Sequence, residues 1–272
     1  MIDKEQSPSK KVDKVNTKMV VGQSAEVLLA YLIVLWAERL LSFAFAVFYQ
    51  VSPTFHLTGL ETGAEGWTGD AVFGVYLLPP LLIALLGVAS LETWKVWMGW
   101  KWIPRSLGFW LSAIAASRLL LSAVIGAFSA AELGYVYTWA FLPRAAQMAL
   151  AAVSLGLFLL YAHHFRMAFL ALNPYKKGVK SDHLRIRYTW TAMTLPWAVP
   201  LGLAALLSAQ RGVFNEFYFT LLWAGIGFFM LWLNDISSPK YHYVRRFYQK
   251  VGYKFSFWTV AVLVLALSYW FR

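Results

Sequence analysis

The chain has 272 residues and a net charge of +11, and 60% of its residues are hydrophobic, 18% aromatic and 14% charged. A soluble domain carries about 25% charged residues and a disordered chain is poor in aromatics, so the composition excludes both classes and predicts an integral membrane protein. Because cysteine is absent, disulfides, thiol nucleophiles, c-type haem attachment and cysteine-ligated metal sites are excluded as well.

The first 20 residues carry charges throughout and read MIDKEQSPSKKVDKVNTKMV. A secretory signal peptide would combine a short apolar core with a small-residue cleavage site, and neither precedes the first long apolar segment. We therefore predict two regions, a basic cytoplasmic tail over residues 1–25 and a single transmembrane domain over residues 26–272.

Seven segments are apolar enough to cross a bilayer, whose hydrocarbon core of about 30 Å needs roughly 20 residues of helix. They lie at residues 27–49, 72–93, 106–128, 139–161, 189–209, 217–234 and 255–271. Pro196 and Pro200 interrupt the fifth segment, where they free backbone carbonyls and predict a kink. The predicted fold class is all-α, a polytopic membrane protein with about seven transmembrane helices.

The distribution of basic residues predicts the orientation of this bundle. If the seven spans alternate in direction, 19 of the 24 lysines and arginines fall on one side. They lie in residues 1–18 and in the loops 94–105, 162–188 and 235–254. Because cytoplasmic loops are enriched in lysine and arginine, we predict a cytoplasmic N-terminus and an outer C-terminus, in a bacterial inner membrane.

Three charged residues fall within predicted spans. Glu38 and Arg39 lie in the middle of the first span, and Arg118 lies at a similar depth in the third. A charge at this depth costs about 2.5–3.5 kcal/mol on insertion scales, so these residues should pair inside the bundle. We predict a Glu38–Arg118 pair. Arg39 then needs another acceptor, such as a backbone carbonyl, an acidic lipid or a partner subunit.

Two interpretations of this cluster remain open. It is either a proton, ion or quinone-linked site, or a structural clamp between the first and third spans. Small residues spaced four apart within 112–117 favour the clamp, because they allow close helix approach. Glu26 and Glu92 should be solvated at the edges of their spans. Arg144, near the outer edge of the fourth span, should reach an outer acid such as Glu132.

Four of the five histidines lie on the predicted cytoplasmic side, with an aspartate beside one of them. The group comprises His163, His164, His183, His242 and Asp182. Imidazoles and carboxylates bind zinc or iron, and imidazole also ligates haem, so a metal, a haem or a phosphate group is a candidate ligand. No closely spaced histidine motif supports these ligands, and contact with lipid phosphates is the simpler interpretation.

Basic residues on the same side are candidates for binding lipid head groups or a cytoplasmic partner, since each contributes about 1 kcal/mol near an anionic surface. This docking set comprises Arg166, Lys176, Lys177, Arg185, Arg187, Arg245 and Arg246. Tryptophans beside lysines over residues 92–102 are typical of a membrane interface. We therefore predict no nucleic-acid partner.

The outer loop 57–70 reads LTGLETGAEGWTGD and holds four glycines and three acids. It could bind a cation but lacks the spacing of a calcium-binding EF-hand, so a flexible solvated loop is expected. The chain also lacks a phosphate-binding loop, a dinucleotide fingerprint and a nucleophile elbow, so whether it is an enzyme stays open.

The leading functional hypothesis is an integral subunit of a multi-subunit membrane complex, of the energy-transducing or electron-transfer kind. Its expected partners are lipids, other membrane subunits and a protein on the cytoplasmic side. In length and number of predicted spans the chain resembles cytochrome oxidase subunit III and anchor subunits of respiratory enzymes, and no residue motif carries this resemblance.

Two alternatives belong to other classes of protein. One is a transporter or channel that uses the Glu38–Arg118 layer and the proline-broken fifth span. The other is a membrane enzyme that acts on lipid or quinone at the cytoplasmic edge, with the residues His163, His164, His183 and Asp182. Its expected cofactor is bound lipid or quinone, or less favourably a haem or metal.

Overall fold

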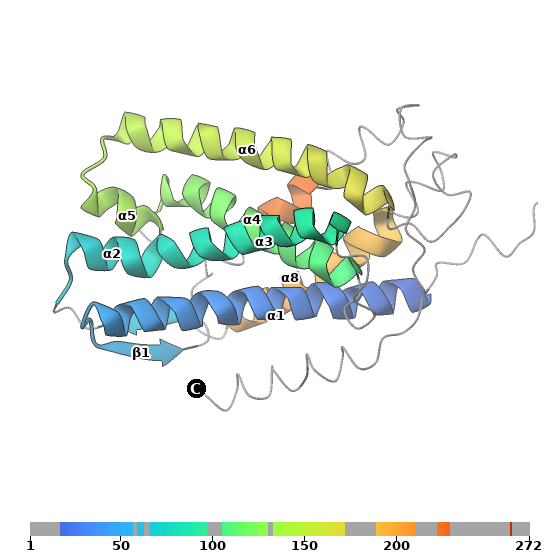
Figure 1. Ribbon diagram of the computed structural model, residues 1–272, viewed down its shortest axis with the longest axis horizontal. Helices are drawn as coiled ribbons and strands as arrows, with labels where there is room; N and C mark the ends of the chain where they lie inside the picture. Colours follow the sequence, from blue (N-terminus) through green and yellow to red (C-terminus); the bar gives the residue numbers. More distant parts are fainter. Residues whose placement is uncertain are drawn as a thin grey trace, which may run out of the picture.

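A computed structural model describes most of the first 171 residues and shorter segments beyond them. The described residues are 17–56, 59–62, 66–96, 105–129, 133–171, 189–209, 222–228 and 262. Their long helices run side by side along the long axis of the molecule (Figure 1). The segments that link α1 to α2 and α4 to α6 lie at the same end, as expected when successive spans alternate in direction.

The first helix, α1 (Thr17–Phe48), has 32 residues and is roughly 48 Å long at 1.5 Å per residue. It begins ten residues before the predicted span. The second predicted span is formed by α2 (Gly69–Tyr76) and α3 (Leu78–Val96), which follow each other with one residue between them. Thr68 caps α2, because its hydroxyl accepts a hydrogen bond from the Ala71 amide at 3.2 Å.

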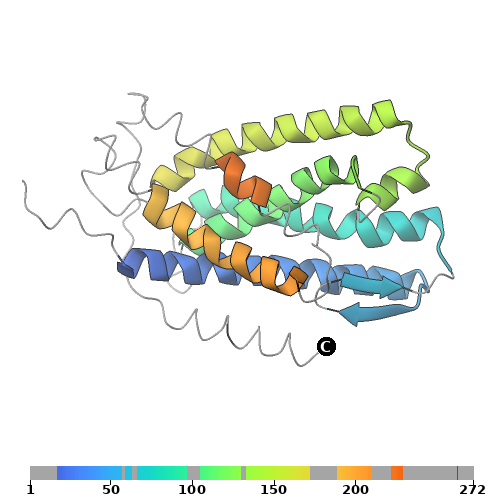
Figure 2. The same cartoon turned by 180° about the vertical axis from the view of Figure 1, so that it is seen from behind.

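The remaining helices continue this pattern. They are α4 (Arg105–Gly126), α5 (Leu133–Trp139), α6 (Arg144–Ala171), the π-helix η2 (Trp190–Thr194) and α8 (Leu195–Ala209). Helix α4 lies at the centre and packs against α1, α3 and α6, while α8 packs along α1 (Figure 2).

Within the described residues, four helices are long and apolar enough to cross a membrane. They cover Met19–Phe48, Gly69–Ala89, Ser106–Gly126 and Arg144–Arg166. They confirm a mainly helical fold and coincide with the first four predicted spans. Of the predicted spans 217–234 and 255–271 the structure describes only residues 222–228 and 262, so the seven-span count and the orientation stay predictions.

The bundle core is rich in aromatic rings. The Phe109 ring of α4 stacks on the Phe165 ring of α6 with 3.9 Å between centroids, and Trp110 lies 6.0 Å from Trp197 of α8. Phe109, Trp110 and Phe165 are at most 1% exposed. Sequence positions far apart are therefore joined by one contiguous apolar cluster.

Close packing of α3 against α4 depends on one glycine. A Cβ placed on Gly87 would lie 2.8 Å from the Cβ of Ala115 and 3.4 Å from the Cα of Ser112. The small residues of the third span therefore face α3 at this point, as well as serving the predicted approach to α1. The helices approach closely here because Gly87 of α3, which has no side chain, lies against the small residues Ala115 and Ser112 of α4.

A short β-hairpin stands beside the mainly helical fold, and its second strand lies within the predicted outer loop. Strands β1 (Pro53–His56) and β2 (Gly59–Thr62) pair antiparallel, with Thr54 opposite Glu61. The hairpin contacts α1. Threonine and phenylalanine in these short runs favour extended backbone, and the glycine-rich composition of the loop concealed this preference.

The proline-broken fifth span is irregular, as predicted, and its irregularity is a π-helix. The amide of Leu195 bonds to the carbonyl of Trp190, five residues earlier. Pro196 follows directly and has no amide hydrogen to donate, and Pro200 lies inside α8. A wider turn before a proline relieves the clash that the pyrrolidine ring makes with the preceding helical turn.

Candidate functional site

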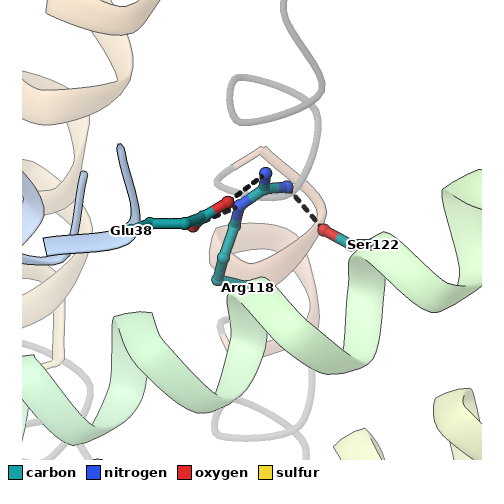
Figure 3. Close-up of polar contacts among 3 residues, drawn as sticks. All are labelled: Glu38, Arg118 and Ser122. Atoms are coloured by element: carbon teal, nitrogen blue, oxygen red, sulfur yellow. Dashed lines mark hydrogen bonds and ion pairs between the residues drawn. The ribbon is translucent and has the colours of Figure 1, made fainter. Parts of the chain in front are cut away.

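The strongest polar contact inside the bundle joins α1 to α4. The Arg118 guanidinium donates from Nη2 to Glu38 Oε1 at 2.8 Å and from Nε to Glu38 Oε2 at 3.0 Å (Figure 3). Arg118 Nη1 also donates to the Ser122 hydroxyl, one turn along α4. Both carboxylate oxygens of Glu38 are therefore engaged, and the predicted Glu38–Arg118 pair is present in the structure.

This pair is enclosed by protein. The side chains of Arg118 and Glu38 are 2% and 5% exposed. Removing two charges from water is costly, and a two-point contact with a further hydrogen bond is the geometry that offsets most of that cost. The pair has no net charge, and it holds α1 against α4 through two hydrogen bonds.

Arg39 is also buried, with 5% of its surface exposed, and it interacts within the chain. Tyr31, 2% exposed, lies within electrostatic reach of both Arg39 and Arg118. Glu38, Arg39 and Arg118 are therefore three buried charged residues on α1 and α4, two helices that pack against each other.

A second set of polar contacts lies nearer the other end of the same helices. Trp110 donates from its indole nitrogen to Gln23 Oε1 of α1 at 2.9 Å, and the Ser112 hydroxyl lies 2.7 Å from the Tyr161 hydroxyl of α6. These contacts tie α4 to α1 and α6. Glu26 is fully buried, which corrects the prediction of a solvated edge residue. The reason is that α1 starts earlier than predicted, so Glu26 lies within the packed helix.

Among the described residues, Arg144 contacts the end of α4 and its own helix, and its predicted contact with Glu132 stays a prediction. Its guanidinium donates to the carbonyl of Ala127 and, at 3.2 Å, to the side-chain oxygen of Gln147. It also lies over the Phe128 ring, 5.6 Å from the centroid. Glu132, the predicted partner, lies outside the described residues. Arg144 therefore fastens the start of α6 to the end of α4.

The described part of the histidine group does not form a metal centre by itself. His163 and His164 are exposed on α6, and within the described residues no group of three or more His, Asp or Glu side chains is placed to hold a metal ion. Arg166 lies 3.5 Å from His163. Residues 182, 183 and 242 lie outside the described segments, so the metal, haem and phosphate hypotheses stay predictions.

The docking set is described at a single position. Arg166 is 3% exposed, so it faces protein and not the open surface that head-group binding was expected to use. The reason is that α6 continues through Ala171, which places Arg166 within the helix and next to the aromatic core. Residues 176, 177, 185, 187, 245 and 246 lie outside the described segments.

An aromatic pocket at the hairpin end of the bundle was not predicted. Its cavity of about 210 Å³ is lined by Trp67, Val72, Tyr76, Tyr135 and Trp139. The sequence signal was present in α5, where Tyr135 and Trp139 are four residues apart and share a helix face. This spacing alone does not predict a pocket, because aromatic residues in membrane proteins are also common at the membrane interface.

Tyr137 holds α5, the helix that supplies Tyr135 and Trp139 to this pocket. Its hydroxyl donates to the Ala123 carbonyl of α4 at 3.0 Å. Burial raises the pKa of Tyr137 above its ordinary value of 10.0, because a phenolate would lose the solvation that water gives it. The phenol therefore stays a donor at neutral pH and keeps α5 against α4.

No protein-family model, curated protein or solved structure matches this chain. The functional argument therefore depends on the geometry described above.

Proposed function

We propose that the chain is an integral membrane subunit of a multi-subunit complex, in which a core tied by Glu38 and Arg118 presents α6 to a neighbouring subunit. The observation that carries this proposal is the exposure of α6. In its most apolar stretch 17% of the residues are buried, against 50–61% in the other three candidate spans. Within the part of the chain that the structure describes, α6 is therefore little covered, and most of its surface is available for lipid or another protein.

The exposed side of α6 has the composition of a helix–helix contact. Ala145, Ala149, Ala152 and Gly156 repeat at intervals of four, three and four residues, and all are exposed. Small residues at this spacing let two helices in a membrane approach closely. A Cβ on Gly156 would meet nothing within 4 Å, so its own chain does not require the glycine. The occupant that fits is a transmembrane helix of another subunit.

The energy-transducing class and the inner-membrane location belong to this proposal and rest on the sequence alone. Their support is the absence of the catalytic motifs sought and the excess of basic residues in four segments. The electron-transfer version requires a redox centre in the complex, which a visible spectrum of the purified assembly would reveal.

A transporter is the second candidate, and the observation that favours it is the burial of three charged residues, Glu38, Arg39 and Arg118, within candidate spans. Ionisable residues within a membrane often mark ion or proton pathways. Against it, both oxygens of Glu38 are held by Arg118, which leaves the carboxylate engaged as a tie.

Photo-cross-linking from α6 tests the subunit proposal. The chain has no cysteine, so Gly156→Cys creates a unique thiol that takes a maleimide-benzophenone. Illumination in native membranes should give an adduct with a different protein. Leu86→Cys on α3, whose leucine is 69% exposed, is the matched control and should label lipid. Equal adducts from both positions would contradict the proposal, and an adduct of twice the chain mass would show self-association instead.

A further inference from the structure

The walls of the aromatic pocket come from three segments that meet at the hairpin end of the bundle. Trp67 precedes α2, Tyr76 ends α2, and α5 supplies Tyr135 and Trp139. The Trp67 and Tyr76 rings are nearly parallel, with centroids 5.6 Å apart, and Tyr76 lies 5.3 Å from Tyr135. These three rings form one continuous aromatic wall, and Trp139 follows one turn after Tyr135.

This wall is held in place before any ligand binds. The Thr68 cap fixes the start of α2, and the hydrogen bond from Tyr137 to Ala123 fixes α5. At the same time Tyr135 and Trp139 are 44% and 40% exposed, so parts of both rings reach the surrounding medium. The pocket is therefore both preformed and open, which limits the entropic cost of binding.

The charge distribution selects the kind of ligand. None of the five lining residues is charged, and the faces of four aromatic rings carry partial negative charge. Asp70, exposed in the first turn of α2, adds a negative charge between Trp67 and Val72 in the sequence. The faces of the rings repel an anion. A cation is attracted, and the Asp70 charge offsets the positive end of the α2 dipole.

The lining also selects among cations. A primary ammonium needs hydrogen-bond acceptors for three N–H groups, whereas the π faces of the rings suit a cation without such donors. The cavity of about 210 Å³ has the volume of about seven liquid water molecules, which leaves space for a trimethylated nitrogen. We propose that this aromatic pocket binds a quaternary ammonium group, carried either by a lipid head group or by a small solute.

Equilibrium dialysis of radiolabelled choline tests this proposal on the full chain in nanodiscs of phosphatidylglycerol. Binding should saturate and be displaced by tetramethylammonium. The neutral isostere 3,3-dimethyl-1-butanol, which has the same shape without the charge, should compete at least about fivefold less well. The same experiment in phosphatidylcholine nanodiscs separates the two sources: suppressed binding identifies the lipid head group as the occupant, and unchanged binding identifies a solute.

Three variants locate the binding in the pocket. Trp139→Leu should weaken choline binding by about fivefold or more, and Trp139→Phe should retain most of it because an aromatic face remains. Trp190→Leu replaces a tryptophan of similar exposure, 44%, outside the pocket and should bind as the wild type does. Absence of choline binding in phosphatidylglycerol, equal competition by the neutral isostere, or wild-type binding by Trp139→Leu would each overturn the proposal.

Discussion

At the scale of single residues, Glu38 and Arg118 form a buried ion pair in which each charge compensates the burial of the other. Each charge lost water on burial, each regains interaction energy from the other, and Arg118 also donates a hydrogen bond to Ser122. Removing one partner leaves an uncompensated charge in an apolar setting, whereas removing both leaves none. This asymmetry distinguishes a structural tie from a site whose carboxylate must change its protonation state.

A double-mutant cycle on this pair is the first prediction. Glu38→Leu alone and Arg118→Leu alone should each lower the free energy of unfolding by about 3–5 kcal/mol, and the double variant should recover most of that loss. Unfolding in mild detergent, followed by circular dichroism, gives the three values. Ser122→Ala is the control and should cost about 1 kcal/mol, because it removes one hydrogen bond and no charge.

The transport alternative makes the opposite prediction for the same residue. If Glu38→Gln unfolds like the wild type and abolishes an ion flux that wild-type liposomes show, the pair is part of a transport pathway. If the variant is destabilised and no flux exists in the wild type, the pair is a tie.

Depth and sign of charge were sufficient to predict the Glu38–Arg118 pair, because a buried arginine in this setting needs a carboxylate at its own level. The same reasoning failed for Glu26, since the sequence does not mark where α1 begins. It also missed the aromatic pocket. The rings of Trp67, Tyr76 and Tyr135 are brought together by the packing of α2 against α5, and no local pattern encodes that contact.

At the scale of elements, two glycines in candidate spans have opposite surroundings. Gly87 lies where α3 meets α4, and Gly156 lies on the exposed side of α6. Both are in helices, where glycine is less favourable than other residues. Contacts within the chain explain the glycine at position 87. The glycine at position 156 is explained by the proposed contact with another molecule.

Substituting leucine at the two positions is the corresponding prediction. Gly87→Leu should push α3 away from α4 and cost about 1–3 kcal/mol or more, because a Cβ alone already approaches Ala115 within 2.8 Å. Gly156→Leu should leave the isolated subunit as stable as the wild type or slightly more so. Thermal unfolding of the two purified variants makes the comparison, and equal destabilisation would contradict the assigned surroundings.

Apolar length predicted the first four spans, but it did not predict their ends or the structure between them. The hairpin β1–β2 arises from short runs with extended preference, which apolar length does not detect. Pro196 predicts an irregular helix at η2, because proline has no amide hydrogen and the hydrogen bonds of the preceding turn must change. Proline position predicts that a helix is irregular, but it does not predict that the irregularity is a π-helix.

At the scale of the whole molecule, composition alone indicated the membrane class, because too little charge is present to cover a soluble surface. The net charge of +11 has a different meaning from the nucleic-acid binding it could suggest in a soluble protein. Most of the basic residues lie in four segments that the predicted alternation of seven spans would place on one side. The few charges within the candidate spans are then used for contacts between helices.

The native mass of the protein extracted from its own membrane in mild detergent tests the proposed function most directly. We expect a mass well above that of one chain, with at least one different protein present in fixed proportion. Gly156→Leu should reduce that proportion while the chain itself stays folded. A homogeneous, folded single chain with no accompanying protein would contradict the assignment as a subunit of a membrane complex.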